Sequence, residues 1–197
     1  MKRVGVLISG RGSNLAALIA TQRPDTYRIV LVIANRADAP GLGIAEAAGI
    51  PSCVIAHHGK TRETFDAEMD AALRAADVEI VALAGFMRIL SDGFVRAWEG
   101  RMVNIHPSLL PAWRGTDVHA RVIAAGETQS GASVHFVVPE LDAGPVIAQD
   151  SVPVHPGDTP ETLAARILAV EHRIYPAALT LLAQGKVRLE HGLAVFD

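Results

Sequence analysis

The sequence lacks the features that define several classes of protein. It contains one cysteine, Cys53, so no disulfide can form within the chain, and this composition suits a reducing compartment. No apolar run approaches the ~20 residues of a membrane span. The 18 Lys and Arg residues against 21 Asp and Glu give a formal net charge of −3, which argues against a nucleic-acid-binding role. We therefore expect a cytoplasmic protein that acts without a membrane or nucleic acid.

The sequence does contain short apolar runs that alternate with amphipathic segments. The runs predict buried strands at 4–8, 29–34, 51–55, 78–83 and 101–105. The first run is too short for a signal peptide. Helical periodicity begins at Ser13 and recurs at 41–48 and 61–76. This order predicts an α/β fold with a doubly wound, mostly parallel sheet flanked by helices and a Rossmann-type N-terminal half.

The pattern changes in the second half of the chain. A short helix is predicted at 118–125, followed by strands at 132–138 and 145–154. Thr159 and Pro160 are typical of a helix start, and an apolar stripe continues from there to Leu181. Because Pro176 lies inside this stripe, we expect a kink there. The segments 187–189 and 193–196 predict a small hairpin.

The first candidate site is the loop SGRGSN at residues 9–14. Its glycines permit a tight turn, and the helix that follows presents free N–H groups to an anion. No Gly-Lys-Ser/Thr follows, Leu15 occupies the place of the third dinucleotide-binding glycine, and Asn35 rather than an acid ends the second strand. The loop therefore favours a phosphate site over an NAD site, and an ordinary glycine turn is the alternative.

Three further loops follow predicted strands, where open parallel sheets bind ligands. In AGFMRIL (84–90), Gly85 allows close approach of a ligand beside apolar side chains, although a buried turn would explain the same residues. In ELDAGPVI (140–147), Asp142 lies in a loop where an Asp is usually a turn former. In NIHPSLLP (104–111), Asn104 and His106 are two apart and so share one face of a strand. This octet is either a polar loop or a catalytic pair.

The remaining candidates favour structural roles. His57 and His58 predict a solvated loop, and Cys53 lies within a predicted strand as a small core residue. No zinc-ligand spacing and no Gly-x-Ser-x-Gly element is present. We expect no metal site.

Taken together, the motifs SGRGSNL, LAGFMRIL, NIHPSLLP, GASVHFV and ELDAGPVI resemble the folate-dependent formyltransferase family, and within it the phosphoribosylglycinamide formyltransferase (glycinamide ribonucleotide transformylase) branch. The resemblance covers essentially the whole chain. It implies transfer of the formyl group of 10-formyltetrahydrofolate to the amine of N1-(5-phospho-D-ribosyl)glycinamide. The products would be the formylglycinamide ribonucleotide and tetrahydrofolate, in de novo purine (IMP) biosynthesis.

The resemblance also implies a role for each matching residue. Asn104, His106 and Asp142 would be catalytic, with Ser133 in support. The ribonucleotide would contact Gly12, Ser13, Asn14 and Glu171. The folate would contact Arg62, Met87, Arg88, Ile89, Leu90 and Asn104. We expect a single domain over 1–197 with a phosphate-binding half (1–100) and a catalytic, folate-binding half (101–197), acting on small molecules as a monomer or homodimer.

The implied mechanism is direct transfer without a metal. The amine attacks the formyl carbon, and Asn104 and protonated His106 donate hydrogen bonds to the oxygen of a tetrahedral intermediate. Asp142 would favour the imidazolium by its opposite charge and relay a proton to the departing folate nitrogen.

Two segments depart from the family pattern, and three rival functions remain open. AWRGTD (112–117) replaces the lysine-aromatic pair of many relatives and is reminiscent of methionyl-tRNA formyltransferase, and Ala143 stands where a second glycine is common. That enzyme carries a further C-terminal nucleic-acid-binding domain, and formyltetrahydrofolate hydrolase carries an extra N-terminal domain. We expect neither domain here, because the sequence ends after the predicted hairpin and its first strand begins near residue 3. The third rival is a nucleotide-binding module without catalysis.

Overall fold

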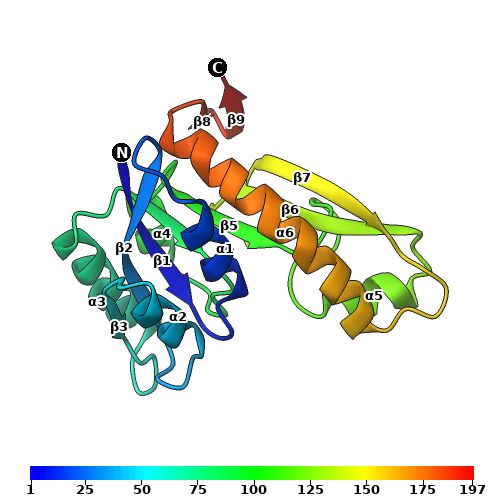
Figure 1. The fold of residues 1–197 in the computed structure, drawn as a ribbon, viewed down its shortest axis with the longest axis horizontal. Coiled ribbons are helices and arrows are strands. Elements are labelled where there is room, and N and C mark those ends of the chain that lie inside the picture. The colour runs from blue at the N-terminus through cyan, green and yellow to red at the C-terminus, as the bar shows by residue number, and fades with distance from the viewer.

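A seven-stranded sheet forms the centre of the structure, a computed structural model that describes residues 1–197 (Figure 1). Its strands are β1 (Lys2–Ile8), β2 (Tyr27–Ala34), β3 (Ser52–Val54), β4 (Ile80–Leu83), β5 (Met102–His106), β6 (Gln129–Phe136) and β7 (Val146–Pro153). Their order is β3-β2-β1-β4-β5-β6-β7. Strands β1 to β5 pair in parallel, whereas β6 runs antiparallel to both neighbours. The predicted mostly parallel sheet is confirmed.

Helices cover both faces of this sheet, as a doubly wound fold requires (Figure 1). They are α1 (Ser13–Thr21), α2 (Gly41–Ala47), α3 (Arg62–Ala75), α4 (Asp92–Ala97), α5 (Val118–Ala124) and α6 (Pro160–Ala183). A hairpin of β8 (Val187–Glu190) and β9 (Leu193–Phe196) follows α6. None of the helices has the length and hydropathy needed to cross a bilayer.

Two hydrophobic clusters lie on opposite faces of the sheet. The larger contains 33 buried residues from the sheet and from α1, α2, α5 and α6, and the smaller contains 14 from the sheet, α3 and α4. Neighbouring residues of one strand belong to different clusters: Val6 packs into the larger and Leu7 into the smaller. This two-sided burial explains why the central strands read as continuous apolar runs rather than as alternating patterns.

The structure departs from the predicted elements in a few places. Strand β5 continues beyond its predicted end to His106. Strand β6 begins earlier than predicted, at Gln129, because Gln129 still pairs with Pro153 of β7 in the antiparallel ladder. Helix α6 continues unbroken through Pro176. The prediction that Cys53 is a core residue is wrong: it is only partly buried because β3 is an edge strand of the sheet.

Tyr175 connects α6 to the two strands at the middle of the sheet. Its hydroxyl donates to the Leu83 carbonyl of β4 at 2.9 Å and to the Val103 carbonyl of β5 at 3.3 Å. The side chain is fully buried, and burial raises the pKa of Tyr175 well above its usual value, so the hydroxyl remains a donor. Helix α6 is thereby attached to the carboxyl end of β4 and to the first half of β5.

We predict that Tyr175→Phe destabilises the protein by about 1–3 kcal/mol, because two buried carbonyls lose a hydrogen-bond donor. In a protein of this size, each kcal/mol lowers the melting temperature by about 2–4 °C. Thermal and urea unfolding of the two proteins would measure this difference. Equal stability would show that the hydroxyl does not hold α6 in place.

Candidate active site

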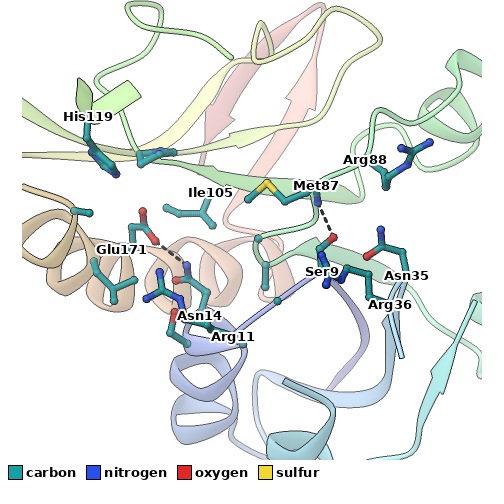
Figure 2. A pocket seen from close by; sticks show the side chains of 18 of the residues that line it. Ser9, Arg11, Asn14, Asn35, Arg36, Met87, Arg88, Ile105, His119 and Glu171 are labelled. Atoms are coloured by element: carbon teal, nitrogen blue, oxygen red, sulfur yellow. Dashed lines mark hydrogen bonds between the residues drawn. The ribbon is translucent and has the colours of Figure 1, made fainter. Parts of the chain in front are cut away.

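A cavity of about 790 Å³ opens at the carboxyl ends of β1, β2, β4 and β5 (Figure 2). Residues 9–14 line one side, and α6 contributes Glu161, Leu168 and Glu171. The loop after β1 is attached to the loop after β4, because the Met87 N–H donates to the Ser9 hydroxyl at 2.7 Å. We call this space the first cavity.

The glycine loop prepares the first cavity for an anion. Gly12 adopts a left-handed φ of 77° at the start of α1, and no side chain caps the helix there. The N–H groups of the first turn of α1 therefore have no partner within the helix. A Cβ at position 12 would lie 2.6 Å from the Cα of Gly41, so only glycine allows this close approach.

Asn14 and Glu171 meet on one side of the first cavity (Figure 2). The Asn14 Nδ2 donates to Glu171 Oε2 at 2.7 Å, and both residues are buried. Burial raises the pKa of Glu171, and the hydrogen bond from Asn14 opposes that rise. The Asn14 Oδ1 is buried and has no hydrogen-bond partner.

A second cavity, of about 590 Å³, lies between the loop after β4 and the loops after β5 and β6. Met87 and Ile89 expose 74% and 58% of their surface, while Leu90 is buried beneath them. Exposed apolar side chains around a cavity suit a flat, partly apolar ligand. The two cavities share six lining residues: Gly85, Met87, Arg88, Ile105, Pro107 and His119. They are therefore adjacent.

The structure brings the three proposed catalytic residues together in the second cavity. His106 Nδ1 lies 3.4 Å from Asp142 Oδ2, and each side chain is only 7% exposed. Asn104 stands two residues before His106 on β5 and also lines this cavity. The turn at Asp142 has a left-handed φ of 50°, a conformation that Asp tolerates better than most residues.

Main-chain groups complete the surroundings of this pair. His106 Nε2 lies 3.0 Å from the Trp113 carbonyl oxygen, and the Gly115 N–H donates to Asp142 Oδ2 at 3.0 Å. A carbonyl only accepts, so Nε2 carries a hydrogen, and Nδ1 faces a carboxylate. A ring with hydrogens on both nitrogens would donate to both acceptors, the Trp113 carbonyl and Asp142.

Ser133 supports the loop after β5 rather than the catalytic residues directly. Its hydroxyl donates to the Ser108 carbonyl at 2.6 Å and accepts from the Leu110 N–H at 3.1 Å. The Gln149 side chain on β7 donates to the Ser133 hydroxyl at 2.7 Å and to the Leu110 carbonyl at 3.0 Å. Strands β6 and β7 thus fix the loop that carries the Trp113 carbonyl.

Most of the predicted site residues lie at one of the two cavities. Gly12, Ser13, Asn14 and Glu171 line the first, and Met87, Arg88, Ile89, Leu90, Asn104, His106 and Asp142 line the second. Arg62 does not: it is exposed at the start of α3 and lines neither cavity. No group of three or more His, Cys, Asp or Glu side chains is arranged to hold a metal ion.

Sequence reasoning missed three histidines that lie at the cavities. His57, which was predicted to lie in a solvated loop, is half-buried and lines the first cavity. His119 lines both cavities, its Nδ1 has no partner, and burial, followed by the charge of His106, lowers its pKa. His135 lies beside Asn104, with its Nε2 3.2 Å from the Asn104 Nδ2. The alternation of 132–138 could have shown that His135 shares a face with Ser133. No sequence signal points to His119.

Comparisons with known proteins find similar sequences and structures over most of the chain. A family profile described as Formyl transferase matches residues 2–179. Phosphoribosylglycinamide formyltransferase of Escherichia coli is 43% identical over 195 residues, 98% of this chain and 92% of that protein. The trifunctional purine biosynthetic protein adenosine-3 of Bos taurus is 54% identical over 190 residues, 95% of this chain but only 19% of that protein. The crystal structure of glycinamide ribonucleotide transformylase 1 from Symbiobacterium toebii matches with a TM-score of 0.96 at 42% identity, covering 100% of this chain and 94% of that one.

The raised pKa of Glu171 predicts how its substitution changes stability with pH. A buried carboxyl with a raised pKa favours the folded state while it is protonated, and this contribution is lost as pH rises through the folded-state pKa. Glu171→Gln is always neutral and keeps the shape. We therefore expect the melting temperature of the variant, relative to the unsubstituted protein, to rise as the pH increases above about 4, the ordinary pKa of a glutamate. A relative stability that falls over this range would contradict the assignment.

Proposed function

The chain belongs to the formyl transferase family, and from this premise we propose that it transfers the formyl group of 10-formyltetrahydrofolate to the amine of N1-(5-phospho-D-ribosyl)glycinamide. The products are the formylglycinamide ribonucleotide and tetrahydrofolate, a step of de novo purine biosynthesis. One observation carries the proposal. A cavity with an anion-binding helix end and a cavity with apolar walls meet beside the His106–Asp142 pair.

The first cavity has the chemistry that the ribonucleotide requires. The unpartnered N–H groups of α1 suit the phosphate, and Ser13 and the backbone of Gly12 lie beside them. Glu171 accepts hydrogen bonds from ribose hydroxyls, while Asn14 holds its carboxyl in place. With the phosphate at α1 and the ribose at α6, the amine points toward Ile105 and Pro107, where the second cavity begins.

The second cavity suits the folate. Met87, Ile89 and Leu90 provide apolar contacts for the pterin, and the main chain of the same loop offers polar groups to its edge. The pterin would place the formyl group near Asn104 and His106. We do not assign Arg62 a contact with the pterin, because its position at the start of α3 is away from both cavities; a contact with a more distant part of the folate remains a prediction.

In the transfer, Asn104 and His106 act as hydrogen-bond donors, and Asp142 acts as a proton relay. The amine nitrogen forms a bond to the formyl carbon, whose oxygen takes the negative charge of the tetrahedral intermediate. Asn104 and His106 donate N–H hydrogen bonds to that oxygen. Asp142 accepts the proton that the attacking amine loses and passes it, through water, to the folate nitrogen as the carbon–nitrogen bond to folate breaks. No step requires a metal or a covalent enzyme intermediate.

His106 must exchange one hydrogen bond before it can act as this donor. Its Nε2 hydrogen is directed at the Trp113 carbonyl oxygen, 3.0 Å away. The formyl oxygen is an acceptor of the same kind and can replace that carbonyl after a small rotation of the ring. The Asp142 contact at Nδ1 can persist through the exchange.

We also infer the domain organisation, the cellular location and the oligomeric state in which the chain acts. The whole chain would act as one domain, with residues 1–100 holding the phosphate and 101–197 carrying the catalytic groups. It would work in the cytoplasm on two small molecules, as a monomer or homodimer, with 10-formyltetrahydrofolate as a co-substrate.

A spectrophotometric assay tests the proposed activity. The protein is mixed with a 10-formylfolate analogue, with and without the ribonucleotide, and release of the deformylated folate is followed. We expect release only in the presence of the ribonucleotide. Release without it would indicate a hydrolase, and no release in either mixture would favour a nucleotide-binding module or a different formyl acceptor.

We predict that Asp142→Asn lowers kcat by about 10²–10⁴-fold with little change in KM, because the amide can neither accept the proton nor stabilise the His106 charge. The change is nearly isosteric, so circular dichroism and melting temperature should report an intact fold. Asp25→Asn is a useful control, since Asp25 is exposed and lines neither cavity. Near-normal turnover by Asp142→Asn would refute the relay.

A further inference from the structure

We propose that His135 is a positioning residue that fixes the orientation of the Asn104 side-chain amide. The inference rests on the proposed function, because Asn104 is the group that would donate to the reacting oxygen. It concerns a residue that does not need to touch either substrate. His135 would act through the hydrogen bond that it accepts from Asn104.

The sheet register places the two side chains together. Asn104 on β5 and His135 on β6 are direct partners in the antiparallel ladder, so their side chains lie side by side on one face. The Asn104 Nδ2 and the His135 Nε2 are 3.2 Å apart. The His135 side chain is only 3% exposed, which leaves little room for the ring to turn.

The backbone determines which ring nitrogen of His135 carries the hydrogen. Nδ1 lies 2.8 Å from the Phe136 carbonyl oxygen, which can only accept, so Nδ1 must be the donor. In a neutral imidazole, Nε2 is then the acceptor. Asn104 must therefore turn its Nδ2 toward His135, because the reversed amide would set Oδ1 against a nitrogen lone pair. One Nδ2 hydrogen is used in this way, and the other remains free.

The Phe136 carbonyl, which selects this tautomer, can lie where it does because residue 144 is a glycine. A Cβ on residue 144 would lie 1.7 Å from the Phe136 carbonyl oxygen and 3.5 Å from the His135 Nδ1. Gly144 therefore packs directly against the Phe136 carbonyl. This gives the glycine of the ELDAGP segment a role that the sequence analysis did not find.

Burial favours the neutral form of His135. Burial lowers the pKa of His135, and the charges of His106 and Arg114 act in the same direction. The Phe136 carbonyl and Asp142 oppose them. Asp142 Oδ1 lies 3.7 Å from Nε2, so a protonated His135 would donate to Asp142 and compete with His106 for it. The neutral ring leaves Asp142 paired with His106.

Two nearly isosteric substitutions separate the functions of the two ring nitrogens. His135→Asn keeps a donor at the Nδ1 position and removes the acceptor at Nε2, whereas His135→Gln can place its Oε1 near the Nε2 position. We expect His135→Asn to lower kcat by about tenfold or more, since a catalytic donor loses its orientation, with KM changed by no more than about threefold. His135→Gln should keep kcat within about threefold of the unsubstituted protein.

A double-mutant comparison tests whether His135 acts through Asn104. In an Asn104→Ala background, His135→Asn should change kcat by less than about twofold, because the group that it orients is already gone. Additive losses, or equal kcat values for the Asn and Gln variants, would overturn the proposal. Melting temperatures of all variants report any loss of folding.

Nuclear magnetic resonance of the unsubstituted protein tests the tautomer without using activity. Long-range ¹H–¹⁵N spectra of histidine-labelled protein should show His135 as the neutral Nδ1–H form at pH 7. An Nε2–H or doubly protonated ring would overturn the proposal. The spectrum also separates the proposed function from the role of His135. Absence of formyl transfer would refute the proposed function, while the spectrum would still show whether the His135 Nε2 can accept a hydrogen bond from Asn104.

Discussion

The site depends on one contact between two buried ionisable side chains, His106 and Asp142, 3.4 Å apart. Each lies almost out of water, where an unpaired charge costs several kcal/mol. Their contact therefore requires hydrogen-bond partners for the remaining polar atoms. The Trp113 carbonyl and the Gly115 N–H are those partners, and both belong to the loop between β5 and α5. Catalytic geometry in this protein is in large part a question of where that loop lies.

The loop between β5 and α5 is held in place by the antiparallel strands β6 and β7. Ser133 and Gln149 bind the main chain at Ser108 and Leu110, and these contacts are largely buried. Farther along, Trp113 has a left-handed φ of 60°. A bulky residue in this region costs on the order of 1–3 kcal/mol and persists only where its surroundings determine it. The antiparallel strands thus have a mechanical role in the site that a purely parallel sheet would lack.

How much of this the sequence could predict differs between kinds of feature. Apolar runs predicted the strands because two-sided burial leaves a direct signal, and their carboxyl ends indicated where Gly12 and His106 would lie. The approach of Asp142 to His106 follows from a loop conformation, which periodicity does not encode. The expected core position of Cys53 failed because edge and central strands have the same local pattern. The role of His135 required the register of β5 against β6, which depends on pairing between distant segments.

The two departures from the family pattern show why such a site tolerates sequence change. In AWRGTD, the groups that reach His106 and Asp142 are a carbonyl and an N–H, which every residue other than proline can supply. The side chains instead stabilise the loop from outside: Arg114 pairs with Glu140 at 2.9 Å, and Arg121 lies over the Trp113 ring. Gly115 is the exception, because its φ of 84° suits glycine. Ala143 makes only a turn hydrogen bond to Glu140 at 3.3 Å, whereas Gly144 next to it meets the Phe136 carbonyl. The chemistry therefore constrains backbone conformation at 115 and 144 more tightly than it constrains side-chain identity at 112, 114 or 143.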